Sequence, residues 1–375
     1  QLASLQQSLR VAQSHMVRAV RTAGRGPLPQ ALLATGPDLH DALAVAVRSN
    51  VGDGERIAAD PASPLILAGT DVLTLRGVLT GPLYQLAPDA LTLDDPDDPT
   101  TGSLTIEATT PSGVPHDLTP LRDMIDGWAQ SGYEPEALLV VGSLDDAVYA
   151  VVEVQPGSTY VETGTQLSRV VLALRVAGGT YTAEFGGLSA GGAYPAGLTT
   201  AAFAGVLEEY RYYVRAEHEI PGVETSPFTP RLSRARLYPG TEAAHQHSPA
   251  ALTVDIADNV LDLQVALGID TDGDAVLVEG APPDGDDDWL FNSQADDPTA
   301  PRYVVNAGGP SRLFYVRLGT LARTDRRDRG FEAATLGVVE DKDYGLPPGA
   351  EYNTTEHRAF RRRWVRSLVD VRNLP

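Results

Sequence analysis

The chain contains no cysteine among its 375 residues. Disulfide bonds, zinc–thiolate sites and cysteine nucleophiles are therefore excluded. No run of apolar residues in this sequence is long enough to cross a membrane as a helix. Lysine is nearly absent too, because Lys342 is the only one and arginine supplies the other basic side chains. We interpret this imbalance as a bias in amino-acid composition and not as evidence of a functional site.

Positive charge is scarce overall. The 29 lysine and arginine residues are outnumbered by 50 aspartates and glutamates, which gives a formal net charge of −21. A surface of this kind repels nucleic acid and anionic lipid. The exceptions are two local basic clusters, at residues 323–329 and 358–366. The length and the 42% hydrophobic content suffice for a substantial core, in one large domain or two ordinary ones.

The clearest pattern lies at the start of the sequence, where apolar residues recur every three or four positions. This spacing predicts an amphipathic helix over residues 1–23. Gly24, Gly26 and Pro27 predict its end. No capping residue precedes Gln1, so we expect the helix to begin upstream of this sequence. The apolar stripe consists of Leu2, Leu5, Leu9, Ala12, Met16, Ala19 and Ala23.

Most of the remaining chain has the composition of β-strands. Val72, Thr74 and Arg76 alternate within a predicted pair of strands over residues 65–79. Further strands are predicted over 137–143, 147–155, 206–219, 312–326 and 360–371, and a short helix over 118–135. Residues 257–267 indicate a short helix or an irregular segment that leads into a strand. One helix followed by many strands, without a βαβ series, favours an α+β fold with the helix on an antiparallel sheet.

The sequence predicts a single unit, residues 1–375, with one interruption. Residues 1–26 form the helix, and residues 27–87 and 136–375 form a β-rich core. Residues 88–135 are rich in aspartate, proline and threonine and separate two groups of strands. We therefore expect this segment to be an insertion.

One candidate metal site is visible. Asp270, Asp272 and Asp274 have the alternate spacing that lets three carboxylates converge on calcium. The segment is not an EF-hand, because Ala275 and Ala281 occupy the places of the invariant glycine and the bidentate glutamate. The alternative is a solvated acidic turn, and the sequence favours it over a calcium site.

Other candidate sites are weaker. His245 and His247 would share one face of a strand, but no third metal ligand accompanies them. No GxSxG motif or comparable arrangement of a nucleophile and a base is present, so we expect no enzymatic activity. The arginine-rich ending, residues 360–371, would either contact DNA phosphates or balance acidic neighbours within a sheet, and its alternation favours the second reading.

Four segments, in order along the chain, resemble the PilW-type minor pilins of type IV pili, which are related to the J-type pseudopilins of type II secretion. The first is SLRVAQSHMVRAVRTAG (residues 8–24) and the second is GTDVLTLR (69–76). The third is the pair NVLDLQVALGIDTDGDA (259–275) and YVRLGTLART (315–324). The fourth is FRRRWVRSLVDVRN (360–373). Together they span nearly the whole chain.

The resemblance implies a pilin-like fold, a long helix on an antiparallel sheet, and a non-enzymatic role in the tip or priming complex of a pilus. It implies an apolar anchor upstream of residue 1, placing the protein in the inner membrane with a periplasmic head and later outside the cell. Other minor pilins and the major pilin are the implied partners. The segment 88–135 and the lack of a disulfide depart from the family.

Two alternatives remain at this point. A DNA-uptake receptor at the tip of a competence pilus is disfavoured by the net charge unless a basic face is segregated. A pseudopilin of type II secretion shares the same resemblance.

Overall fold

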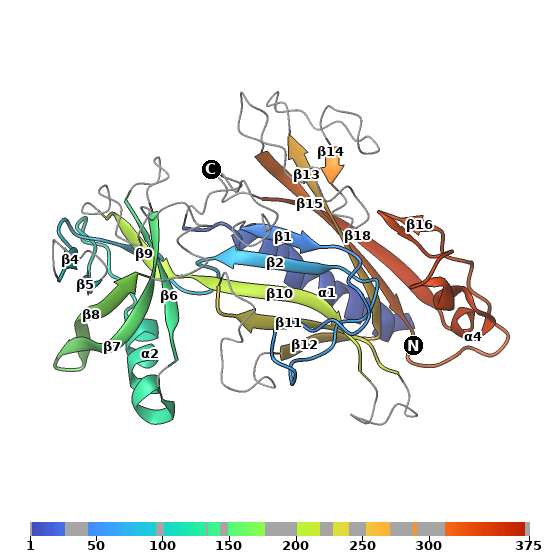
Figure 1. Cartoon of the computed structure of the whole chain (residues 1–375), viewed down its shortest axis with the longest axis horizontal. Coiled ribbons are helices and arrows are strands. Elements are labelled where there is room, and N and C mark those ends of the chain that lie inside the picture. Colours follow the sequence, from blue (N-terminus) through green and yellow to red (C-terminus); the bar gives the residue numbers. More distant parts are fainter. Residues whose placement is uncertain are drawn as a thin grey trace.

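The computed structural model describes residues 2–26, 44–94, 101–132, 134–142, 149–176, 201–217, 228–239, 253–270, 288–290 and 312–371. Figure 1 shows a long helix beside two sheets, with a third, larger sheet at one end of the molecule. Within the described ranges, no helix is both long and apolar enough to span a membrane.

The predicted N-terminal helix is confirmed as α1 (Leu2–Thr22). Gly24 and Gly26 follow it with φ of 75° and 104°. This left-handed backbone conformation ends the helix, and only glycine adopts it without steric strain. The Gly24 N–H then donates to the Arg76 carbonyl oxygen at 2.9 Å, which attaches the end of the helix to a strand. Most of the apolar stripe is buried, as Leu5, Leu9, Ala12, Met16 and Ala23 show.

A five-stranded antiparallel sheet supplies much of the surface beneath α1. Its order is β1-β2-β10-β11-β12. The strands are β1 (Val45–Arg48), β2 (Val72–Gly77), β10 (Glu208–Arg215), β11 (Arg231–Leu237) and β12 (Thr253–Asp258). All four pairings are antiparallel.

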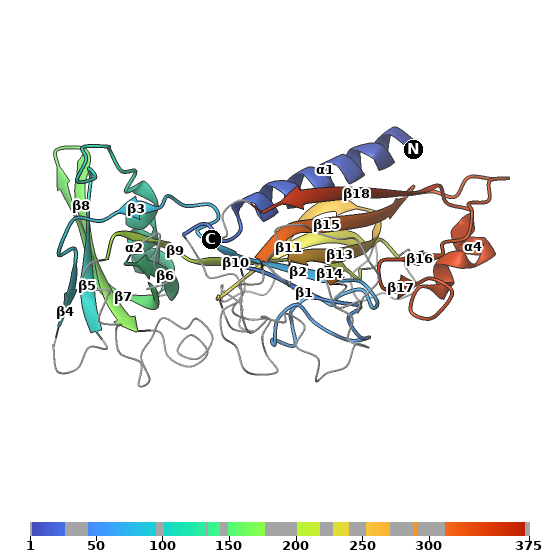
Figure 2. The ribbon, with the colours of Figure 1, turned by 90° about the horizontal axis from the view of Figure 1, so that it is seen from above.

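A second, four-stranded sheet continues directly from the first. Its order is β14-β13-β15-β18, and the strands are β13 (Val260–Asp270), β14 (Asp288–Leu290), β15 (Arg312–Arg323) and β18 (Arg362–Asp370). Asn259, with φ of 59°, is the one residue between β12 and β13. Figure 2 shows α1 lying along these strands, and one hydrophobic core joins the helix to both sheets.

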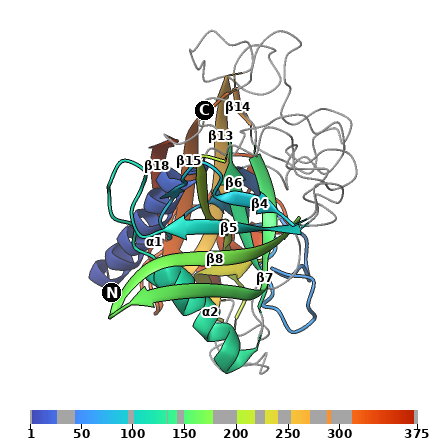
Figure 3. The same ribbon diagram turned by 90° about the vertical axis from the view of Figure 1, so that its left-hand side faces the viewer.

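The third sheet has seven strands and a core of its own. Its order is β3-β9-β6-β7-β8-β5-β4, and the helix α2 (Thr119–Ser131) packs on β7 and β8 (Figure 3). The strands are β3 (Tyr84–Gln85), β4 (Leu91–Leu93), β5 (Thr101–Glu107), β6 (Glu136–Val141), β7 (Tyr149–Thr163), β8 (Gln166–Val176) and β9 (Phe203–Val206). The predicted insertion, residues 88–135, supplies β4, β5 and α2, and the other strands come from residues on either side of it.

The last elements form a small extension beside β18. They are β16 (Val338–Val339), β17 (Lys342–Asp343), the 3₁₀ turn η4 (Ala350–Asn353) and α4 (Thr355–Arg358). Tyr344 and Tyr352 pack from this extension against Leu261 of β13 and Leu321 of β15. The extension therefore covers the end of the four-stranded sheet with aromatic side chains.

The predicted α+β, pilin-like fold with a helix on a single antiparallel sheet is wrong. The structure is 48% strand and 16% helix, and its strands form several sheets, including a half-barrel. The physical reason is that alternation predicts a strand but not its partner. Leu75 of β2, for example, pairs with Tyr210 of β10, far along the chain.

The expected helix or irregular segment over residues 257–267 is also absent. These residues end β12 and form most of β13. Val260, Leu261, Leu263, Val265 and Leu267 are all buried. From Leu261 to Leu267 the apolar residues alternate with Asp262, Gln264 and Ala266, so the period of a strand is present in the sequence, and both faces of the strand are buried.

Candidate functional site

The exposed face of α1 carries arginine and no acidic residue. Its inner face packs in the core. The exposed positions among those whose burial is described are Ala3, Gln6, Gln7, Arg10, Val11, Ser14, Arg18 and Arg21. The whole chain has a formal charge of −21. A helix without a single carboxylate is therefore a local stripe of positive potential on an acidic protein.

A groove runs between α1 and the five-stranded sheet. It encloses about 460 Å³ between Arg10, Arg18 and neighbouring side chains of α1 and the ring of Tyr210 opposite. The Arg234 guanidinium lies over that ring, with 4.2 Å between Cζ and the ring centroid. A second depression of about 400 Å³ adjoins it, and the 44% exposed Val11 lines both. The groove is thus open, and both arginine and apolar side chains line it.

His15 connects α1 to the wall of this groove. Its Nδ1 lies 3.0 Å from the Tyr212 hydroxyl, in hydrogen-bonding contact. Burial lowers the pKa of His15, and the nearby charges of Arg234 and Arg18 lower it further. The imidazole is therefore neutral at neutral pH. The positive charge in the groove comes from the guanidinium groups of the arginines.

The predicted calcium site falls largely outside the described residues. Asp270 is the last residue of β13, whereas Asp272 and Asp274 lie outside those residues, as do His245 and His247. No group of three or more potential metal ligands occurs in the part of the chain that the structure describes. Calcium binding at Asp270, Asp272 and Asp274 stays a prediction, and so does the absence of enzymatic activity.

The two basic clusters are distributed among acidic and backbone partners. Arg361 pairs with Asp328 at 2.6 Å, and Arg327 pairs with Glu356. Arg323 is buried and donates to the Phe228 carbonyl oxygen at 2.7 Å. Of these three arginines only Arg361 belongs to the ending 360–371; it has an acidic partner, but Asp328 lies in a loop and not in a sheet as predicted.

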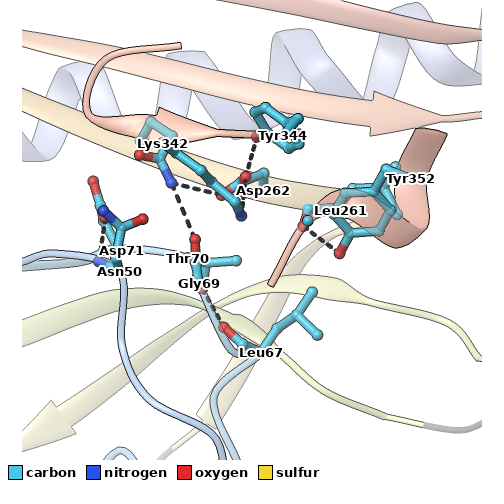
Figure 4. A network of polar contacts seen from close by, with 12 residues as sticks. Asn50, Leu67, Gly69, Thr70, Asp71, Leu261, Asp262, Lys342, Tyr344 and Tyr352 are labelled. Atoms are coloured by element: carbon cyan, nitrogen blue, oxygen red, sulfur yellow. Dashed lines mark hydrogen bonds and ion pairs between the residues drawn. The ribbon is translucent and has the colours of Figure 1, made fainter. Parts of the chain in front are cut away.

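A buried polar centre lies where the C-terminal extension meets β13 (Figure 4). The Lys342 ammonium is 2.6 Å from Asp262 Oδ2, and the two side chains are 4% and 0% exposed. The Tyr344 hydroxyl donates to the same oxygen. Gln264 Nε2 donates to Asp262 Oδ1 at 3.0 Å. One buried carboxylate therefore accepts from three side chains.

Asp71 adds a second buried carboxyl group to this centre. Its two oxygens accept the backbone N–H groups of Asn50 and Val265 at 2.9 and 2.7 Å. Burial raises the pKa of Asp71 well above its usual range, and the negative charges of Asp341 and Asp262 raise it further. This shift favours the protonated form of Asp71, against the two backbone hydrogen bonds, which lower the pKa.

We missed this centre from the sequence because we attributed the single lysine, Lys342, to amino-acid composition and not to a site. The signal was present, since a chain that otherwise uses arginine keeps one lysine. Arginine cannot replace lysine where a compact amine must fit or where the amine must lose its proton. Asp262 gave no signal of its own, because its partner is 80 residues away.

No known family model, curated protein or solved structure matches the chain. The resemblance to PilW-type minor pilins therefore rests on the four segments alone.

Proposed function

We propose that the chain is a non-enzymatic structural subunit of a type IV pilus, a minor pilin of the tip or priming complex. The carrying observation is the acid-free, arginine-bearing face of α1 beside an open groove. Four segments that resemble PilW-type minor pilins support the same role. The proposal concerns assembly and does not depend on a single-sheet fold.

The occupant of the groove, in this proposal, is the helix of a neighbouring filament subunit. α1 has 21 residues, about 32 Å at 1.5 Å per residue, which is long enough to pack along another helix. Gln7, Val11, Ser14 and Arg18 lie three or four positions apart and form one exposed ridge. Acidic side chains on the partner would complement Arg10 and Arg18, and such complementarity chiefly sets orientation and specificity.

Site-specific photocrosslinking in the producing bacterium tests this role. A photoreactive amino acid replaces Val11 in the groove, and a matched variant carries it at Val338, which is 67% exposed on β16. We expect the probe at Val11 to form adducts that contain pilin subunits, because the helices pack together in the filament. The probe at position 338 should form few such adducts. Equal adducts from both positions, or adducts with no pilin, would contradict the proposal.

A further inference from the structure

The centre of Lys342 and Asp262 has the arrangement of two groups about to condense. The amine is 2.6 Å from the carboxyl oxygen, and neither side chain reaches solvent. Aromatic rings enclose the amine: Lys342 Nζ lies 4.9 Å from the centroid of Tyr344 and 5.9 Å from that of Tyr352. Leu261, Leu321 and Trp364 belong to the same cluster.

We propose that Lys342 and Asp262 form an intramolecular amide bond, an isopeptide crosslink between β17 and β13. The bond would join two residues that are 80 positions apart. It would connect the C-terminal extension covalently to β13, one of the two inner strands of the four-stranded sheet. The chain has no cysteine, so no disulfide can do this.

The reaction consumes the neutral forms of both groups. Removing two opposite charges from water costs desolvation free energy, and their mutual attraction offsets this cost only partly. A proton transfer from the Lys342 ammonium to the Asp262 carboxylate removes both charges and yields a free amine beside a carboxylic acid. The amide that follows carries no charge either, so its formation relieves the same penalty.

The step balances without any other reactant. The neutral Nζ attacks Cγ of the protonated Asp262 carboxyl group, so an Nζ–Cγ bond forms. A Cγ–O bond breaks, and that oxygen leaves as water with one proton from the carboxyl group and one from the amine. No atom changes oxidation state through an external oxidant or reductant.

The surrounding donors suit this reaction. Tyr344 and Gln264 donate to the two oxygens of Asp262, where negative charge develops as the amine adds. Asp71 lies in the same polar centre (Figure 4), where burial and the negative charge of Asp262 raise the pKa of Asp71, so its effect on the step is electrostatic. The fold holds the amine and the carboxyl group in contact, so the reaction does not depend on a diffusional encounter of two separate molecules.

The intact mass of the unfolded wild-type chain is the decisive measurement. We expect it to fall below the mass of the sequence by one water molecule. Lys342→Arg keeps the positive charge but removes the amine, and this matched control should have its full sequence mass. Wild-type protein at its full mass, or a loss of water that persists in Lys342→Arg, would overturn the proposal.

A second variant identifies the bonded carboxyl group. Asp262→Asn presents an amide to the same amine, so crosslinking would release ammonia in place of water. A proteolytic digest should contain one branched peptide that joins the segments around positions 262 and 342. A third measurement uses the single lysine: an amine-reactive label on the unfolded chain should leave Lys342 unmodified in wild type and modify it in Asp262→Ala. Labelling of Lys342 in wild type to the same extent as in Asp262→Ala would count against the bond.

Discussion

Arg76 Nε lies 2.7 Å from Glu209 Oε2, and the two side chains are no more than 1% exposed. The residues face each other directly across β2 and β10. Arg211, two residues farther along β10, contacts the other oxygen of Glu209 at 2.9 Å. A charged cluster thus lies in the middle of a sheet, and it is stable only while each charge keeps its partner.

Replacement of Arg76 by methionine should destabilise the protein strongly. The change keeps much of the side-chain volume but leaves Glu209 buried with less compensating charge, and breaking a buried pair in this way costs about 3–5 kcal/mol. Urea unfolding of Arg76→Met against wild type measures the loss. The double variant Arg76→Met with Glu209→Gln should recover part of it, and a double variant as unstable as the sum of the single ones would show that the two residues are not coupled.

Gln13 should matter more than its neighbours on α1. It is buried, and its Nε2 donates to Thr320 Oγ1 at 2.7 Å and to the Val365 carbonyl oxygen at 3.2 Å. Gln13→Leu removes both donors and leaves buried acceptors unsatisfied, which costs about 1–3 kcal/mol. The exposed Gln6→Leu is the control and should change the free energy of unfolding by less than about 0.5 kcal/mol. Similar effects of the two substitutions would contradict the assigned contacts.

The sequence was sufficient to predict α1. Its inner face is fully buried and its outer face is polar, so Leu9, Ala12 and Met16 recur with the helical period. Gly24 and Gly26 then mark its end through a conformation that other residues avoid. Both signals involve residues close together in the chain, so they can be recognised in a single sequence.

Other features depend on contacts between distant residues. β13 alternates from Leu261 to Leu267 as a strand does, but its polar residues Asp262 and Gln264 are buried by partners far along the chain. The pairing of β2 with β10 and the meeting of Lys342 with Asp262 each join residues that no periodicity connects. Alternation at Val72, Thr74 and Arg76 predicted a strand, yet both of its faces are buried, which places the Arg76 charge inside the molecule.

Stability should depend on pH through His15. Its folded pKa is lowered, whereas the unfolded chain has the ordinary value of about 6.5. The unfolded state therefore binds more protons below that pH, and the stability present at neutral pH is lost as the pH falls below about 6.5. Urea unfolding at several pH values should show a steeper acid loss in wild type than in His15→Asn. Identical slopes would mean that His15 titrates alike in both states.

Charge reversal on α1 should impair filament assembly. Arg10→Glu with Arg18→Glu removes the positive stripe from the groove. Arg326→Glu with Arg329→Glu makes the same change in charge at exposed positions far from α1 in sequence, and serves as the matched control. We expect surface pili, counted in sheared fractions, to fall severalfold only in the first variant. Normal piliation with a correctly folded Arg10→Glu, Arg18→Glu protein would contradict the proposed packing.

The isolated chain should not bind duplex DNA at about 150 mM salt, where weak electrostatic contacts are screened. Within residues 323–329, Arg326 is 81% exposed but lies 3.8 Å from Asp325, and Arg327 pairs with Glu356. The net charge of −21 adds a general repulsion. Fluorescence anisotropy with a labelled duplex, repeated at low salt, measures the affinity.

Micromolar binding at about 150 mM salt would favour the DNA-uptake receptor over the structural minor pilin, because phosphate contacts supply most of the affinity for DNA. Two variants then locate the contact. Loss of binding in Arg326→Glu with Arg327→Glu would assign it to the C-terminal cluster. Loss in Arg10→Glu with Arg18→Glu would assign it to α1, and the groove would then bind a nucleic acid in place of a neighbouring helix. Binding that survives both variants would exclude both surfaces as the source of the affinity.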